Sequence, residues 1–186
     1  MEIDQIISFD DKNYIVCHVY YRTMGSHDQR LMPYVTDRIE HRRTFGLVSR
    51  HDKLFWVKEY TQPDYGHSIT YEFEETSKLH YPTTVDGNLI RTVRMISVSG
   101  NRLLMEYCDG YVKLKDAKLN PDQRKMVTKL ISKWIDEHDV HDYDMCENNI
   151  MVKAESNLSL ILIDFEYSVG VNEERWLRFL EGWFNA

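Results

Sequence analysis

Three oxygen-bearing side chains in the second half of the sequence have types and spacing suited to phosphoryl transfer. Asp144 stands five residues before Asn149, which opens an apolar run, and Asp164 follows fifteen residues later at the end of a second apolar run. This spacing places three oxygen ligands or acceptors around one point, as metal-assisted phosphate transfer requires. A carboxylate directly after four aliphatic residues is costly unless a metal or a cation compensates its charge. The sequence therefore predicts a phosphoryl-transfer site at these residues.

A long helix, a polar loop and two strands are expected to position these side chains. Asn120 followed by Pro121 is a typical helix start, and apolar residues recur after it at helical spacing. The helix, the loop and the two strands are predicted at 120–137, 138–148, 149–153 and 158–163. Asn172 is expected to cap a last amphipathic helix with an apolar face formed by Trp176, Phe179, Leu180 and Trp183.

The first half of the chain is predicted to be rich in strands. Runs of β-branched and aromatic residues predict strands at 14–21, 44–49, 54–60, 91–98 and 102–106. The second and third of these strands are expected to form a hairpin around the polar turn 50–53, and the last two a hairpin across 99–101. Between the hairpins, residues 68–79 contain several glutamates and few helix breakers before Tyr81-Pro82, which predicts a short helix.

Residues 142–152 and 160–166 together resemble two motifs of the protein-kinase-like superfamily. These are the catalytic loop and the metal-binding motif, in the form seen in choline kinases and aminoglycoside phosphotransferases. In this resemblance Asp144 matches the catalytic aspartate, Asn149 the loop asparagine and Asp164 the metal-binding aspartate. The resemblance implies ATP and Mg²⁺ as cofactors, with Asn149 and Asp164 as metal ligands.

Residues 55–58 resemble the strand whose lysine holds the α- and β-phosphates of the nucleotide. Lys58 is therefore expected to bind the nucleotide and to take part in catalysis. Glu72 or Glu75 on the following helix could orient Lys58 through an ion pair. Glu72 is favoured because Thr76 and Leu79 stand four and seven residues after it, as in the family.

Residues 103–110 resemble the strand and hinge that join the two lobes of this family. There, the backbone groups of Glu106 and Cys108 are expected to meet adenine, and Met105 to limit the pocket behind it. The resemblance spans about residues 44–168. It implies an α+β, two-lobed protein-kinase-like fold with a much reduced C-terminal lobe.

The expected lobes are a strand-rich nucleotide-binding lobe at 1–109 and a small, mainly helical lobe with the catalytic loop at 110–186. Three departures from the family pattern accompany this division. Asp142 stands where a histidine is usual, no GxGxxG precedes Lys58 although Gly46 lies in that region, and only 20 residues follow Glu166. The substrate-binding half is therefore expected to be minimal.

The function expected from these motifs is ATP-dependent transfer of the γ-phosphate to a hydroxyl of a protein Ser/Thr or of a small molecule. The alternative is a catalytically dead kinase-like module that acts through a protein partner, which the missing glycine loop favours. The joint presence of Lys58, Asp144, Asn149 and Asp164 opposes that alternative. Two weaker alternatives are a glycosyltransferase DxD pair at 142–144 and a phosphohydrolase with His-Asp pairs at 138–139 and 141–142.

Composition excludes several other classes of protein. The 186 residues have a net charge of −7, which argues against nucleic acid as the main partner. The longest aliphatic run, 160–163, is far shorter than the roughly 18 residues of a membrane-spanning helix. Three widely spaced cysteines without a CxxC pair indicate reduced thiols, and the acidic start of the chain is unlike a secretory signal. A cytoplasmic protein is expected, with its oligomeric state open.

Overall fold

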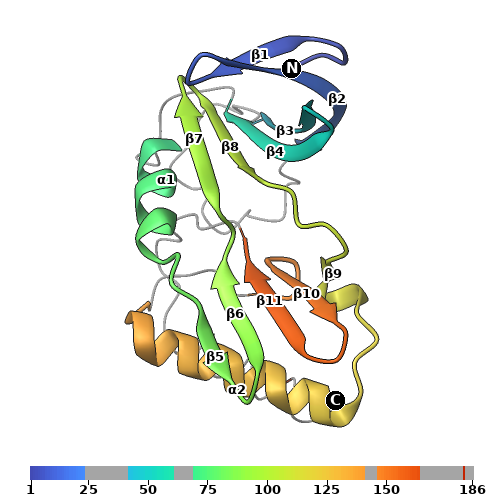
Figure 1. Cartoon of the computed structure of the whole chain (residues 1–186), viewed down its shortest axis with the longest axis vertical. Helices are drawn as coiled ribbons and strands as arrows, with labels where there is room; N and C mark the ends of the chain where they lie inside the picture. The colour runs from blue at the N-terminus through green and yellow to red at the C-terminus, as the bar shows by residue number, and fades with distance from the viewer. Residues whose placement is uncertain (24–41, 61–68, 141–145, 164–181, 183–186) are drawn as a thin grey trace, which may run out of the picture. The chain divides into compact units, whose positions relative to one another are not determined.

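A computed structural model describes residues 1–23, 42–60, 69–140, 146–163 and 182 (Figure 1). The chain forms two compact units, one of Met1–Phe73 with Met95–Tyr107 and the other of Glu74–Arg94 with Cys108–Ala186. The segment 74–94 thus belongs to the second unit, whereas the predicted lobes divide the chain once, after residue 109. That division into lobes stays a prediction. The expected terminal helix after Asn172 lies outside the described residues.

The first unit is built on a six-stranded sheet in the order β1-β2-β3-β4-β8-β7 (Figure 1). All neighbouring strands are antiparallel. The strands are β1 Ile6–Phe9, β2 Lys12–Thr23, β3 Arg42–Arg50, β4 Lys53–Tyr60, β7 Met95–Ser99 and β8 Arg102–Glu106. The predicted β3–β4 hairpin is confirmed. Its two central turn residues, His51 and Asp52, have φ values of 50° and 60°, which suits the twist of a two-residue hairpin turn.

Strand alternation divides the side chains of β4 between the two faces of this sheet. Phe55 and Val57 pack into the core, while Trp56, Lys58 and Tyr60 belong to the opposite face. The buried core residues are Ile7, Phe9, Tyr14, Val16, Val48, Val57 and Leu104. Burying a large apolar side chain stabilises the fold by about 1.5–3 kcal/mol, so this cluster fixes which face of β4 is turned inward.

Helix α1, Ile69–Lys78, follows β4 in the described chain and confirms the short helix predicted at 68–79. Beyond it, the hairpin predicted across 99–101 is confirmed by the antiparallel pairing of β7 with β8, but its first strand, predicted at 91–98, is not continuous. β6, Asn88–Thr92, belongs to the sheet of the second unit, and β7 begins at Met95 in the first sheet. The Val93 amide donates to the Leu162 carbonyl at 2.8 Å, which continues the parallel pairing of β6 with β11 for one more residue. The backbone therefore changes partner between Val93 and Met95.

The second unit contains a five-stranded sheet in the order β5-β6-β11-β10-β9 (Figure 1). Its remaining strands are β5 Thr83–Val85, β9 Val112–Lys113, β10 Ile150–Ala154 and β11 Leu158–Leu162. β6 and β11 pair in parallel, and the other pairs are antiparallel. β10 and β11 confirm the two strands predicted at 149–153 and 158–163. A short 3-10 turn, Leu114–Asp116, follows β9.

Helix α2, Pro121–His138, packs against β5, β6 and β11 and confirms the helix predicted at 120–137. Asn120 caps it with a full capping box, since its side chain accepts from the Gln123 amide and the Gln123 side chain accepts from the Asn120 amide. Val127, Leu130, Ile131 and Trp134 form its buried face, packed in one cluster with the apolar residues of the hairpin β10–β11. The helix therefore supports the hairpin on which Asn149 lies. No helix among the described residues is long and apolar enough to cross a membrane.

Candidate active site

A buried ion pair joins Lys58 on β4 to Glu72 on α1. The Lys58 Nζ lies 3.1 Å from Glu72 Oε1 and 3.0 Å from Glu72 Oε2. Only 1% of Lys58 and 4% of Glu72 is exposed to solvent. Glu75, the other candidate partner in the sequence, pairs instead with Lys78 on the helix surface. The ion pair expected between Lys58 and Glu72 is therefore present.

A buried ion pair of this kind adds little net stability to the fold. Removing an ammonium and a carboxylate from water costs several kcal/mol for each ion, which their attraction offsets only when the geometry is good. Replacing such a pair by apolar residues of similar volume often leaves the stability of the fold unchanged or raises it. The pair instead holds an ammonium group at a defined point on the sheet, which is what a phosphate-binding lysine needs.

Aromatic rings border Lys58 on the same face of the sheet. Register places Tyr20, Phe45 and Lys58 side by side across β2, β3 and β4, so their side chains share one face. Trp56, two residues before Lys58, lies 5.7 Å from the Tyr20 ring and 5.9 Å from the Tyr107 ring, between ring centroids. Tyr20 is 50% exposed. This aromatic face was missed by the sequence analysis, although the alternation of β4 around Lys58 could have indicated it.

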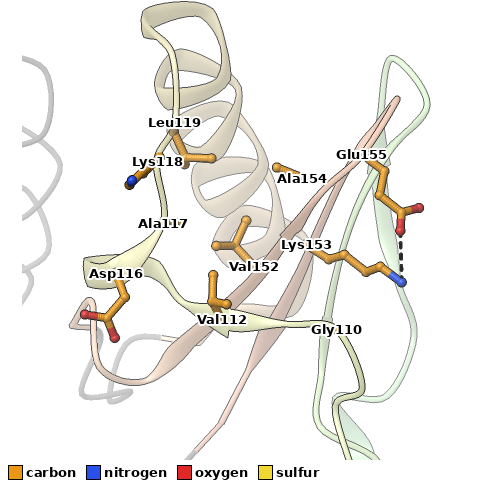
Figure 2. A pocket seen from close by; sticks show the side chains of 10 residues that line it. All are labelled: Gly110, Val112, Asp116, Ala117, Lys118, Leu119, Val152, Lys153, Ala154 and Glu155. Atoms are coloured by element: carbon orange, nitrogen blue, oxygen red, sulfur yellow. Dashed lines mark ion pairs between the residues drawn. The ribbon is translucent and has the colours of Figure 1, made fainter.

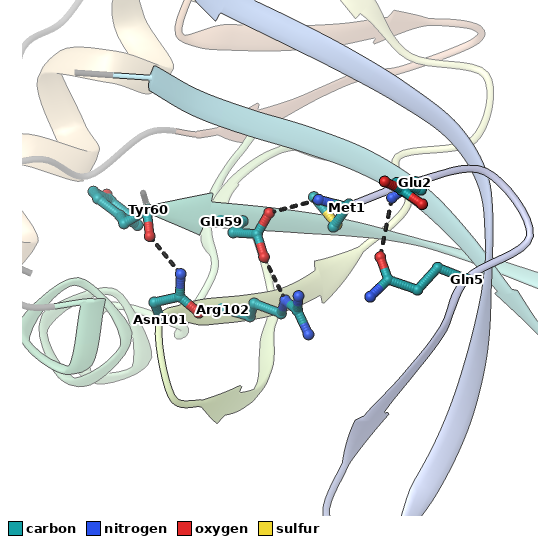
Figure 3. Close-up of polar contacts among 7 residues, drawn as sticks. All are labelled: Met1, Glu2, Gln5, Glu59, Tyr60, Asn101 and Arg102. Atoms are coloured by element: carbon teal, nitrogen blue, oxygen red, sulfur yellow. Dashed lines mark hydrogen bonds and ion pairs between the residues drawn. The ribbon is translucent and has the colours of Figure 1, made fainter. Parts of the chain in front are cut away.

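The opposite face of β4 carries a second buried carboxylate, that of Glu59. Glu59 Oε2 lies 2.9 Å from the Met1 ammonium and Glu59 Oε1 lies 2.7 Å from Arg102 Nε (Figure 3). Burial raises the pKa of Glu59, but the hydrogen bonds and charges of these two cations outweigh burial and hold that pKa below its ordinary value. Consecutive residues of β4 are thus ion-paired on opposite faces, which fixes the strand that carries Lys58.

The predicted hinge residues lie at and beyond the end of β8. Met105 is buried on β8 beside Trp56, and Glu106 is the last residue of this strand. Cys108, in the second unit, accepts at its carbonyl from the Tyr111 amide at 3.2 Å. The contact of Glu106 and Cys108 with adenine stays a prediction.

Asn149 opens the hairpin β10–β11 in the second unit and is 8% exposed. The backbone amide of Asn149 donates to the Cys146 carbonyl at 2.9 Å, and its backbone carbonyl accepts from the Ile163 amide at 2.9 Å. Ile163 directly precedes Asp164 in the sequence. The structure therefore brings Asn149 next to the residue before Asp164, while Asp144 and Asp164 themselves lie outside the described residues.

The residue types at positions 149 and 164 are of the kind that a magnesium ion prefers. Mg²⁺ prefers oxygen ligands and is usually bound by one or two carboxylates together with substrate phosphates. The amide oxygen of Asn149 and the carboxylate of Asp164 are donors of that class. Within the described ranges, no group of three or more His, Cys, Asp or Glu side chains is placed to hold a metal.

An open pocket of about 370 Å³ lies elsewhere in the second unit, between the turn after β9 and the end of β10 (Figure 2). Its charged lining residues are Asp116, Lys118, Lys153 and Glu155. Lys153 Nζ lies 3.0 Å from Glu155 Oε1, and this hydrogen bond raises the pKa of Lys153. Of the predicted site residues that the structure describes, none lines this pocket.

Residues 83–182 match the family model described as the RIO domain, and this match covers more than half of the chain. The chain belongs to the RIO domain family. This family is an atypical protein-kinase-like one, so the predicted membership of the protein-kinase-like superfamily is confirmed. The predicted α+β, reduced kinase-like fold is confirmed with it. A search of curated proteins finds no match to the chain.

The RIO domain match covers some of the predicted site residues and leaves out others. It spans Glu106, Cys108, Asn149 and the two aspartates Asp144 and Asp164, but it begins after Lys58 and Glu72. The family match therefore says nothing of Lys58 and Glu72, whose predicted roles are supported by this chain's own sequence and by the geometry of the first unit.

Proposed function

We propose that this RIO-family chain is an ATP-dependent phosphotransferase that moves the γ-phosphate to a hydroxyl group. The observation that most supports the proposal is the buried pair of Lys58 and Glu72, because it holds a cation with no evident use in folding. The partly exposed ring of Tyr20 and the neighbouring Trp56 support it further. Stacking of a nucleic-acid base on such rings is worth about 1–3 kcal/mol, and a purine nucleotide offers the same surface.

Each predicted residue then has a defined task. Lys58, oriented by Glu72, binds the α- and β-phosphates. Backbone groups of Glu106 and Cys108 meet the adenine ring. Asp144 orients the acceptor hydroxyl and takes its proton.

The metal is proposed to be held by Asn149 and Asp164. Bound Mg²⁺ supplies positive charge that compensates the phosphate oxygens. The hydrogen bond between Asn149 and Ile163 contributes by tying the two ligand-bearing chain segments together. Because each of these tasks depends on position more than on covalent chemistry, most of the rate enhancement comes from alignment and charge.

The acceptor is a protein Ser/Thr or a small hydroxyl-bearing molecule such as an amino alcohol. We place the protein in the cytoplasm. The test is transfer of labelled γ-phosphate to the protein itself, to generic protein acceptors and to amino alcohols. Asp144→Ala should lower transfer about 100-fold or more while nucleotide affinity stays nearly unchanged. Asp136→Ala, which removes an exposed carboxylate from α2, is the matched control.

A specific observation favours the alternative of a catalytically dead binding module. Gly46 lies within β3, paired with Val19 and Val57, and is not part of a loop. A Cβ at this position would lie 2.9 Å from Met1 Sδ, near the flexible end of that side chain, which would have to move. Gly46 therefore lies in a regular strand pair and gives no support to a glycine-rich loop over the phosphates. Wild-type protein that binds Mg·ATP but transfers no phosphate to any of the acceptors above would establish this alternative.

A further inference from the structure

Tyr60 contacts the same carboxylate as the candidate phosphate-binding lysine. Its hydroxyl donates to Glu72 Oε2 at 2.6 Å, and that oxygen also accepts from Lys58 Nζ at 3.0 Å. The Lys58 ammonium lies 5.2 Å from the centroid of the Tyr60 ring, within range of a cation–π interaction. Tyr60 therefore touches both members of the buried pair.

The backbone of Tyr60 is fixed by Asn101 in the turn between β7 and β8 (Figure 3). The Tyr60 amide donates to the Asn101 carbonyl at 3.0 Å, and the Asn101 side-chain amide donates to the Tyr60 carbonyl at 2.5 Å. Gly100 supports this turn with a φ of 58°, a conformation that favours glycine. The sheet therefore fixes the backbone from which the Tyr60 side chain reaches Glu72 on α1.

These contacts matter when Lys58 turns toward a phosphate. An ammonium has three donor hydrogens, and in this structure the Lys58 ammonium contacts both oxygens of Glu72. A buried carboxylate oxygen that loses a donor pays a desolvation penalty. A second donor on Oε2 reduces that penalty, so Lys58 can shift toward a ligand while Glu72 keeps its orientation.

We propose that Tyr60 is a positioning residue that holds Glu72 in place for Lys58. The proposal rests on the proposed function for its catalytic meaning, but its structural content concerns only the first unit. Tyr60 does not act on the phosphate itself. It acts through Glu72, and Asn101 acts through Tyr60.

The test compares Tyr60→Phe with wild type and with a control variant, Tyr81→Phe. Tyr81 belongs to the second unit and is 67% exposed. The first measurement needs no nucleotide. Acetylation of Lys58 by an amine-reactive ester, followed by peptide mass spectrometry, reports how often the buried ammonium leaves Glu72. We expect Tyr60→Phe to lower the Lys58 acetylation rate about tenfold, because Glu72 Oε2 then loses the donor that compensates it when the Lys58 ammonium leaves. Tyr81→Phe should leave the rate unchanged.

The second measurement is the dissociation constant and the KM for Mg·ATP. Tyr60→Phe should raise both about tenfold with kcat altered much less, because the hydrogen bond positions a binding group. Asn101→Ala should shift the acetylation rate and the KM each in the direction seen for Tyr60→Phe, by a smaller factor. It also provides the test if Tyr60→Phe does not fold.

The outcomes separate this proposal from the proposed function. An unchanged Lys58 acetylation rate in both Tyr60→Phe and Asn101→Ala overturns the positioning role, whatever the activity of the wild type. If wild-type protein neither binds Mg·ATP nor transfers phosphate, the proposed function fails. A lowered Lys58 acetylation rate in Tyr60→Phe would even then establish that Tyr60 positions the pair.

Discussion

At the scale of single residues, Glu59 offers a test of how the strand that carries Lys58 is fixed. Its carboxylate is ion-paired with the Met1 ammonium and with Arg102. Because these cations hold the pKa of Glu59 below its ordinary 4.5, the folded protein binds a proton there less readily than the unfolded chain does. The pairs therefore stabilise the fold above about pH 4.5, and this stabilisation fades as the pH falls through the folded-state pKa.

We expect Glu59→Gln to lower the free energy of unfolding at pH 7 by about 2 kcal/mol. The difference from wild type should shrink in acid, where the Glu59 carboxylate of the wild type is itself protonated. Urea unfolding at pH 7 and below pH 4 measures both values. Glu155→Gln is the matched control, because the pair that Glu155 forms with Lys153 is exposed and should be worth little. A difference between Glu59→Gln and wild type that stays constant with pH would contradict the assigned ion pairs.

The residues of the candidate site were predictable to different degrees, for physical reasons. Lys58 and Glu72 could be paired from sequence, because the helix that follows the lysine strand carries family spacing around Glu72. Tyr60 was not recognised, since its hydrogen bond to Glu72 crosses from a strand end to a helix and no local pattern encodes it. Strand alternation does place Tyr60 on the face of Lys58, so that part was available from sequence.

At the scale of elements, helix α2 is a test of how local signals support the site. The Asn120 side chain accepts from the Gln123 amide at 2.9 Å, and its own amide donates to the Gln123 side chain at 3.0 Å. We expect Asn120→Ala to lower the free energy of unfolding by about 1 kcal/mol, because the first turn loses its cap. Thermal or urea unfolding measures this loss.

Asn120→Asp keeps an acceptor at the cap and is the matched control, so it should stay within a few tenths of a kcal/mol of wild type. Lys125→Ala, at an exposed position within the same helix, controls for changes in helix propensity. Equal stability of Asn120→Ala and Asn120→Asp would show that the capping box contributes nothing here.

Elements with strong local signals were predicted, and the failure has a tertiary cause. Helix α2 has a cap, a proline and a regular apolar face, and the β3–β4 hairpin has a polar turn between apolar runs. The strand predicted at 91–98 contains four residues that favour strands, Thr92, Val93, Ile96 and Val98, and no Gly or Pro that would interrupt it. Its division into β6 and β7 is set by Leu162, which lies far along the chain and takes the Val93 amide. The strand propensities of neighbouring residues cannot predict a hydrogen bond to a residue so far along the chain.

At the scale of the whole molecule, the predicted site residues are divided between the two compact units. Lys58 and Glu72 lie in the first unit, and Asn149 with the chain around Asp164 lies in the second. The RIO domain match begins at residue 83 and covers the second group without the first. Sequence comparison therefore supports the metal-binding half of the proposal, and the geometry of the first unit supports the phosphate-binding half.

This division makes Mg·ATP a test of the whole molecule. A ligand that binds only the folded state stabilises it by about 2.7 kcal/mol at a concentration 100 times its Kd. We expect Mg·ATP to raise the unfolding midpoint of the wild type. Asp164→Asn should largely remove the effect, because one carboxylate supplies much of the charge that holds the metal. Lys58→Met should reduce the effect as well, although it alters the other unit.

The same experiment with ATP and a chelator separates the two contributions. Without a divalent ion, wild type and Asp164→Asn should respond alike, whereas Lys58→Met should still respond less than either, because its defect concerns the phosphates directly. Asp136→Asn on the surface of α2 is the control for loss of a carboxylate. Stabilisation of Asp164→Asn by Mg·ATP equal to that of the wild type would remove Asp164 from the metal site. Unequal responses of wild type and Asp164→Asn in the chelator would assign Asp164 a role that does not depend on the metal.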